Sequence, residues 1–297
     1  MANQKVLRSG FQKDPFERWN ISEKDRAAYA RKGRNYALGP NSKSRSGVPK
    51  GAISEHRLDD CAVYAGVAHD YWIYVPKQYK ASKAACLMVF LDGESFIDAP
   101  VNAAVVMDNL IHQKQVPVMI GVFINAGPAG PGYPIYGGSD NRSIEYDSTN
   151  ANYAKFLLDD VLPRLHHSYN ISSDPDCCGI AGSSSGGNAA FTVAWERPDA
   201  FRRVISLVGS FVDIRGANRY PSIIRRSARK PLRIFLQAGA KDLDTVFGSW
   251  PIANQDMAAA LAYREYDYEF EFGEGGHSIC HGASILPDAM RWLWRKP

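Results

Sequence analysis

From residue 51 onward, short apolar runs alternate with stretches of helical periodicity, and this alternation limits the folds open to the chain more than any other feature. Several of the runs are continuously apolar, as expected for strands that are covered on both faces. The expected strands are 70–75, 86–91, 118–124, 178–181, 203–207, 232–237 and 266–272. The expected helices between and after them are 101–114, 151–167, 185–196, 252–263 and 283–294. The order predicts an α/β protein with a mostly parallel central sheet and helices on both faces.

The first 50 residues follow a different pattern. They are largely irregular, with a short helix expected at 22–34, where Ser22 is a suitable cap, and a connector rich in Gly, Pro and Ser at 39–51. We expect one catalytic domain over 51–297, preceded by an N-terminal extension over 1–50.

Charge is uneven along the chain. Residues 1–57 hold 13 Lys and Arg against 5 Asp and Glu, whereas the whole chain has a net charge of +4. The basic residues are scattered and no nucleic-acid motif accompanies them, so we expect a solvated extension and no nucleic-acid partner. No apolar run approaches the roughly 20 residues that span a membrane, and the first residues hold no apolar core of a secretory signal.

The five cysteines indicate a reducing compartment. Their number is odd and their spacing is irregular, which argues against a disulfide framework and favours the cytoplasm. The neighbouring pair Cys177 and Cys178 leaves open a thiol redox function, although both precede the run 179–181 on an expected buried strand, where Cys behaves as a small apolar residue.

The sequence GIAGSSSGGN (179–188) places a serine on the turn between an expected strand and an expected helix. Only Ser184 lies at the centre of a Gly-x-Ser-x-Gly frame, which runs from Gly182 to Gly186. Such a strand–turn–helix setting is typical of a nucleophile elbow, in which glycines allow the strand and helix backbones to crowd together. The alternative is a Ser- and Gly-rich loop that only caps the helix.

A serine hydroxyl needs a base to take its proton, and elbow enzymes place the acid and then the histidine after the serine. Two histidines follow Ser184. His277 lies in a glycine-rich loop after the last expected strand, whereas His281 falls near the next helix, so position favours His277.

The acid is expected after the strand 232–237. Asp242 follows that strand by a few residues and is the first candidate, with Asp244 as the alternative and Glu274 as a more remote one. Its role is to orient the imidazole and stabilise its charged form. Each of these three carboxylates could instead be a solvated loop residue with no catalytic role.

Two backbone N–H groups are candidates for an oxyanion hole. Ser185, directly after the nucleophile, begins the helix whose N-terminus favours negative charge. The second donor should come from the loop DGESF after the strand 86–91, at Gly93 or Glu94.

The stretches FLDGESF, GSSSGGNAAF, LQAGAKD and GEGGHSICHGASILPDAMRWLW resemble the Putative esterase family of the α/β-hydrolase superfamily over about residues 65–297. The resemblance is to its enterochelin-esterase-like and feruloyl-esterase-like branch. It implies an α/β-hydrolase fold, with Ser184 as nucleophile and His277 as base. The Gly-x-x-Asp turn of feruloyl-esterase relatives matches Gly239–Asp242.

The same resemblance implies substrate contacts. The stretch DNRSIEYD (140–147) is similar to an Arg-containing loop that lines the family's substrate cleft, so Arg142 and Glu145 are expected to touch substrate. Trp250 follows the turn that carries the expected acid and could line the pocket. Three tyrosines in or near the irregular loop 124–138 would suit an aromatic group: Tyr133, Tyr136 and Tyr146.

These features together predict a serine carboxylic-ester hydrolase with no metal or organic cofactor. The resemblance implies a small-molecule ester as its substrate, aromatic or linked to a sugar or a siderophore. Two alternatives remain, an acyltransferase with the same triad and a non-catalytic binding protein on a hydrolase scaffold. A monomer or a homodimer is expected.

Overall fold

The computed structural model describes residues 36–128 and 141–296. The predicted helix at 22–34 and the tyrosines Tyr133 and Tyr136 lie outside the described residues.

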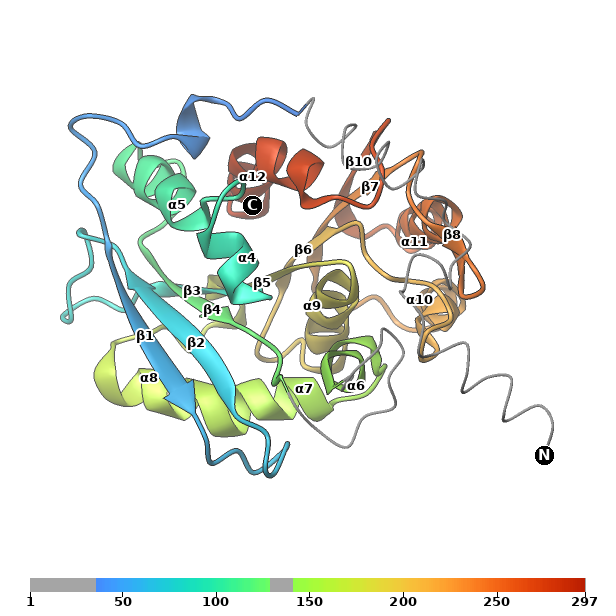
Figure 1. Cartoon of the computed structure of the whole chain (residues 1–297), viewed down its shortest axis with the longest axis horizontal. Coiled ribbons are helices and arrows are strands. Elements are labelled where there is room, and N and C mark those ends of the chain that lie inside the picture. The colour runs from blue at the N-terminus through green and yellow to red at the C-terminus, as the bar shows by residue number, and fades with distance from the viewer. Residues whose placement is uncertain (1–35, 129–140, 297) are drawn as a thin grey trace.

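An eight-stranded sheet runs through the described part of the chain (Figure 1). Its spatial order is β1-β2-β4-β3-β5-β6-β7-β10, in which β1, β2 and β4 pair antiparallel and all the other neighbours pair parallel. The strands are β1 (Ala52–Leu58), β2 (His69–Val75), β3 (Cys86–Leu91), β4 (Met119–Ile124), β5 (Cys178–Ser183), β6 (Arg203–Leu207), β7 (Arg233–Gly239) and β10 (Asp267–Gly273). All seven predicted strands are confirmed within one or two residues at each end, and the mostly parallel sheet is confirmed with them.

The sheet separates two apolar cores, because successive side chains of a strand point to opposite faces. In β3, Leu87, Val89 and Leu91 belong to one core, whereas Met88 and Phe90 belong to the other. Both faces of β3 are therefore covered, which explains why its sequence is continuously apolar.

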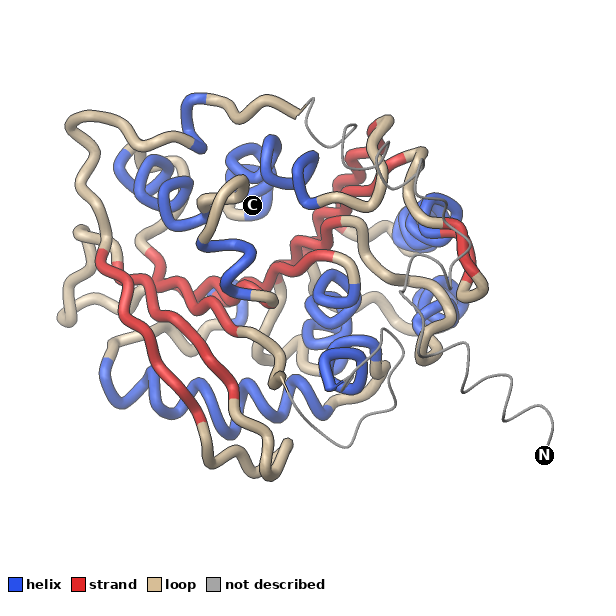
Figure 2. The backbone as a smooth tube through the Cα atoms, viewed as in Figure 1, coloured by secondary structure: helices blue, strands red, loops and turns tan. Residues whose placement is uncertain are grey.

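Helices cover both faces of the sheet (Figures 1 and 2). The core of one face includes side chains of α4 (Gly93–Ile97), α5 (Ala103–His112) and α12 (Ile279–Leu293). The core of the other face includes side chains of α7 (Asn152–Lys155), the π-helical segment η3 (Phe156–Val161), α8 (Leu162–Ser168), α9 (Ser185–Glu196), α10 (Tyr220–Arg226) and α11 (Trp250–Tyr263). This arrangement is the α/β-hydrolase fold that the sequence predicted.

The predicted helices form, with different ends in most cases. The helix at 185–196 is confirmed as α9, and 101–114 is shortened to α5. The stretch 151–167 is divided among α7, η3 and α8. The helix predicted at 283–294 begins earlier, at Ile279, because the Ser278 side chain caps it by accepting from the backbone N–H of Cys280 at 3.2 Å.

The sequence did not predict the edge strand β1, the helices α4, α6 (Asn141–Asp147) and α10, or the two-residue strands β8 (Asp244–Thr245) and β9 (Gly248–Ser249). β1 was not predicted because its residues AISEHRL are mostly exposed and polar, with little apolar pattern. The short helices α4, α6 and α10 have 5 to 7 residues, too few for a helical period to stand out.

The described residues that precede β1 pack on α5. The side chain of Asn109 in α5 donates to the carbonyl oxygens of Asn41 and Lys43, and the Gly51 N–H donates to Asp108 Oδ1 at 2.8 Å.

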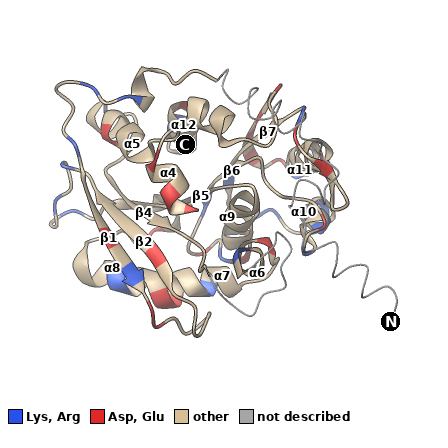
Figure 3. Cartoon of the chain, in the orientation of Figure 1, with Lys and Arg blue, Asp and Glu red and all other residues tan. Residues whose placement is uncertain are grey.

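In the view of Figure 3, basic and acidic residues are interspersed over the helices and strands. Among the described residues, no helix is long and apolar enough to cross a membrane.

Candidate active site

Ser184 occupies the turn between β5 and α9 in a conformation that few non-glycine residues adopt, with φ 59° and ψ −123°. The crossing of strand and helix leaves no room at Gly182, where a Cβ would lie 2.1 Å from the Gly186 carbonyl oxygen. The turn is also fastened to the last residue of β6, since the Ser184 N–H donates to the Leu207 carbonyl at 2.9 Å. These contacts hold Ser184 at the carboxyl end of β5 in a strained conformation.

Three side chains predicted from the sequence lie in one hydrogen-bonded row. Ser184 Oγ lies 2.8 Å from His277 Nε2, and His277 Nδ1 lies 2.6 Å from Asp242 Oδ1. Asp242 follows β7 and His277 follows β10, and the carboxyl ends of these parallel strands meet at the same edge of the sheet as the end of β5. Asp242 is buried, whereas the His277 side chain is 21% exposed and can be reached from solvent.

The direction of these hydrogen bonds follows from the chemistry of the groups. A carboxylate only accepts, so His277 donates its Nδ1–H to Asp242. His277 Nε2 then carries a lone pair and accepts from the Ser184 hydroxyl. This tautomer is the one that a general base for Ser184 requires.

The alternative residues lie elsewhere. Asp244 is exposed in β8, and Glu274 pairs with Lys241 at 3.2 Å on the surface. His281 is buried in α12, where its Nδ1 lies 3.0 Å from Gln237 Nε2 and burial lowers its pKa. The structure therefore brings Asp242, not Asp244 or Glu274, to the imidazole of His277.

The candidate oxyanion donors lie at two helix starts. Ser185 is the first residue of α9 and Gly93 the first of α4, and such N–H groups have no acceptor within their own helix. The Glu94 N–H instead donates to Asn125 Oδ1 at 3.2 Å. A Cβ on Gly93 would lie 2.3 Å from the Phe123 carbonyl carbon, so only glycine fits there. Of the two candidates in this loop, the contacts favour Gly93.

Arg142 joins α6 to the loop after β3. Its guanidinium makes a bidentate ion pair with Asp92, with distances of 2.8 Å for Nε–Oδ1 and 2.7 Å for Nη2–Oδ2. Burial opposes the charge, but the Asp92 carboxylate outweighs it and raises the pKa of Arg142. Both residues line a hollow of about 310 Å³, together with Glu94, Ser95, Asn125, Ala126, Gly127 and Pro128. Arg142 therefore lies beside the candidate oxyanion loop with part of its side chain facing solvent.

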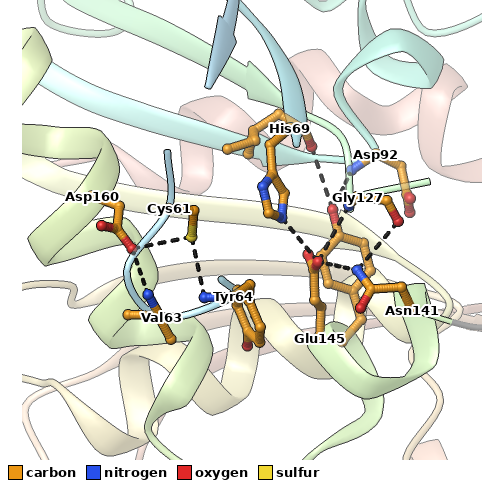
Figure 4. A network of polar contacts seen from close by, with 11 residues as sticks. Cys61, Val63, Tyr64, His69, Asp92, Gly127, Asn141, Glu145 and Asp160 are labelled. Carbon is orange, nitrogen blue, oxygen red and sulfur yellow. Dashed lines mark hydrogen bonds and ion pairs between the residues drawn. The ribbon is translucent and has the colours of Figure 1, made fainter. Parts of the chain in front are cut away.

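Glu145 does not lie where a substrate could touch it, contrary to the sequence-based expectation. Its side chain is fully buried, and its Oε1 lies 2.9 Å from His69 Nε2 (Figure 4). The same oxygen accepts from the Gly127 N–H at 3.2 Å and from the Asn141 side chain. Glu145 thus ties Gly127 to the start of α6, which is a structural contact.

Trp250 is also buried, at 1% exposure, so it does not form an open wall of the pocket. Its indole N–H donates to Ser210 Oγ at 3.2 Å, and its ring packs edge-on against His277 with centroids 5.7 Å apart. It lies behind the candidate catalytic side chains. Tyr146 is buried as well, which raises its pKa well above its ordinary value, and its hydroxyl accepts from the Asp92 N–H at 3.2 Å.

Sequence reasoning missed Ser210, whose Oγ lies 3.3 Å from Ser184 Oγ. Ser210 follows β6, a parallel neighbour of β5, so its place after that strand was the available signal. His69 was missed because it begins β2, the strand next to the edge of the sheet, and lies far in sequence from the motifs around Ser184 and His277. In the described ranges, no group of three or more His, Cys, Asp or Glu side chains could hold a metal ion.

The sequence profile of the family described as "Putative esterase" matches residues 68–292 of this chain. Among curated proteins, the chain is similar to an Iron(III) enterobactin esterase of Dickeya dadantii (strain 3937), with 26% identity over 239 residues. That match covers 75% of this chain and 51% of the relative, so the chain spans about half of the relative's length.

Two solved structures share the fold. The enterobactin esterase of Shigella flexneri, solved in the presence of enterobactin, superposes with a TM-score of 0.68 at 23% identity, over 83% of this chain and 60% of that one. A ferulic acid esterase of Anaeromyces mucronatus, solved with ferulic acid, gives a TM-score of 0.69 at 13% identity, over 88% of this chain and 97% of that one.

Proposed function

This chain belongs to the Putative esterase family, and on that premise we propose that it is a serine carboxylic-ester hydrolase. The observation that carries the proposal is the hydrogen-bonded row of Ser184, His277 and Asp242 at the carboxyl edge of the sheet. Ser184 is the nucleophile, His277 the general base and Asp242 the acid that holds the imidazole.

In the first half of the reaction, Ser184 Oγ bonds to the ester carbonyl carbon while its proton moves to His277 Nε2, 2.8 Å away. The carbonyl oxygen becomes an oxyanion, for which the N–H groups of Ser185 and Gly93 are the proposed donors. The tetrahedral intermediate then loses the alcohol, which takes the proton from His277 as the C–O bond breaks. An acyl group remains on Ser184.

In the second half, water replaces the alcohol. His277 takes a proton from the water as its oxygen bonds to the acyl carbon, and the second intermediate collapses by breaking the bond to Ser184 Oγ. His277 returns the proton to Ser184, and the carboxylic acid leaves. No step in this sequence requires a redox change.

The relatives support a proposal for the substrate class. One is named for enterobactin and another was solved with ferulic acid, so we propose an ester that is aromatic or linked to a siderophore or a sugar. Arg142, about a third exposed above the hollow beside Gly93, is the proposed contact for an anionic or polar group of that substrate. Five free cysteines are the ground on which we propose a cytoplasmic setting.

The test is hydrolysis of nitrophenyl acetate and of nitrophenyl esters of aromatic acids by the native protein and by Ser184→Ala. Ser183→Ala is the matched control, because Ser183 is the neighbouring serine at the end of β5. We expect turnover by the native protein and the control, with loss of turnover of about 10⁴-fold or more in Ser184→Ala. Equal turnover by Ser184→Ala would overturn the proposal, and a new ester formed from an added alcohol would identify an acyltransferase.

A further inference from the structure

A second hydroxyl lies beside the nucleophile, from a residue that the mechanism above does not use. Ser210 follows β6 and is buried at 1% exposure. Its backbone N–H donates to the Ser184 carbonyl oxygen at 3.0 Å, so the loop that carries it is fastened to the elbow. Its Oγ lies 3.3 Å from Ser184 Oγ, and from distance alone either oxygen could be the donor.

One end of the row decides which oxygen donates. Asp242 accepts from His277 Nδ1, so His277 Nε2 accepts the only hydroxyl proton of Ser184. Ser184 therefore has no proton left for a bond to Ser210. In the resting enzyme, the proton between the two serine oxygens must belong to Ser210.

The other end gives the same direction independently. The Trp250 indole N–H can only donate, and it lies 3.2 Å from Ser210 Oγ. Ser210 Oγ accepts that bond, which leaves its own proton free to point at Ser184 Oγ, 3.3 Å away. Trp250 is buried at 1% exposure and packs against His277, so its N–H direction is fixed by its surroundings.

We propose that Ser210 is a further catalytic residue, which donates a hydrogen bond to the reacting oxygen of Ser184, and that Trp250 is a positioning residue that sets the direction of this bond. The inference rests on the proposed ester hydrolysis. It completes a directed chain of hydrogen bonds from Trp250 through Ser210, Ser184 and His277 to Asp242.

The bond acts on both halves of the reaction. When the Ser184 proton leaves for His277, negative charge grows on Oγ before its bond to carbon is complete, and a donor stabilises that charge. When the acyl-enzyme breaks down, Ser184 Oγ is the leaving oxygen, and the same donor stabilises it again. The bond also holds the Ser184 side chain in the rotamer that faces His277.

The experiment compares kcat/KM for nitrophenyl acetate, and the rate of labelling by a fluorophosphonate, among the native protein, Ser210→Ala, Trp250→Phe and the double variant. We expect a loss of about 10- to 100-fold in both rates for Ser210→Ala, the range of a hydrogen bond to a developing charge. Trp250→Phe should lose about 3- to 10-fold, and no further loss should follow when it is added to Ser210→Ala.

Ser206→Ala is the matched control. Ser206 is buried in β6, and among the described residues its Oγ has no hydrogen-bond partner, so this variant should keep native rates. Thermal unfolding of each variant reports whether it is folded. Alanine is smaller than serine by one oxygen, so it fits in the space of Ser210. Native rates in folded Ser210→Ala would overturn the inference, and so would an equal effect of Trp250→Phe in both backgrounds. A native protein without activity would instead refute the proposed function.

Discussion

Asp92 lies next to the candidate oxyanion loop in a left-handed conformation, with φ 55° and ψ 54°. Such a backbone costs of order 1–3 kcal/mol in a non-glycine residue, so surrounding contacts must hold it. The two-pronged ion pair with Arg142 is the clearest of these contacts, and the Asp92 N–H also donates to Tyr146. We therefore expect this residue pair to fix where the N–H of Gly93 points.

Arg142→Lys tests that control. Lysine keeps the charge but cannot make the planar two-pronged contact, so Asp92 and Gly93 lose part of their positioning. We expect kcat for nitrophenyl acetate, a substrate with no anionic group, to fall about 10-fold. Arg164→Lys, in an exposed pair with Asp60, serves as the control and should keep native kcat. A native kcat in Arg142→Lys would show that the pair does not position the loop.

Asp242→Asn tests the acid. The amide can donate to His277 Nδ1, which would move the imidazole proton to Nε2 and remove the base for Ser184. We expect kcat to fall about 10²- to 10⁴-fold, while Asp244→Asn, on exposed β8, stays near native. Steady-state kinetics on both variants measure this. Should Asp244→Asn lose the larger factor, the assignment of the acid would be reversed.

His281 predicts a pH dependence of stability. Burial lowers its pKa in the folded chain below the ordinary value of 6.5. As the pH falls through 6.5, the unfolded chain binds a proton there that the folded chain does not, so the free energy of unfolding decreases. Urea unfolding between pH 7.5 and 5.5 measures it against His281→Asn, which keeps an acceptor for Gln237 but does not titrate. The variant should lose less stability over this range than the native protein; an equal loss would contradict the assignment.

At the scale of elements, Tyr36, which precedes β1, packs against the loop that carries His277. Tyr36 stacks on His281, with ring centroids 4.3 Å apart and planes 11° apart. A Cβ on Gly275 would lie 3.0 Å from the Tyr36 hydroxyl, so the tyrosine lies directly against the loop between β10 and α12. Tyr36 therefore has a structural contact with the loop that presents His277, the proposed base.

Removing this contact should loosen the loop. Tyr36→Ala should lower kcat about 3- to 10-fold with little change in KM, because His277 is out of place part of the time. Tyr36→Phe keeps the stacked ring and should restore most of the activity. A deletion through residue 50 also removes Tyr36 and should lower kcat as well. Native kcat in Tyr36→Ala would refute this role.

The elements that the sequence predicted best are those with a physical pattern of their own. β3 and α9 were predicted at their observed bounds, because full burial makes one continuously apolar and glycines mark the start of the other. The loop positions of Ser184, His277 and Asp242 followed from parallel strands ending at one edge. The burial of Glu145 and Trp250 could not be predicted in this way, because it depends on partners such as His69 and Ser210 that lie far away in sequence.

At the scale of the whole molecule, all five cysteines are free thiols, and three of them are buried: Cys61, Cys86 and Cys178. Burial raises the pKa of Cys61 to about 11 and that of Cys178 to about 12, so these groups hold almost no thiolate at pH 8. Titration of the native protein with a thiol reagent should therefore label Cys177 and Cys280 first. Denaturation should release all five, and fast labelling of all five in native protein would contradict this packing.

In the proposed reaction, Ser184, and no other group of the molecule, becomes covalently bonded to the acyl group. The most direct measurement is the intact mass of the native protein after treatment with a fluorophosphonate, followed by peptide mapping of the adduct. We expect one adduct per chain, on Ser184, with full loss of esterase activity, and no adduct on Ser184→Ala or on heat-unfolded protein. An adduct on another residue, or full activity with Ser184 labelled, would contradict it.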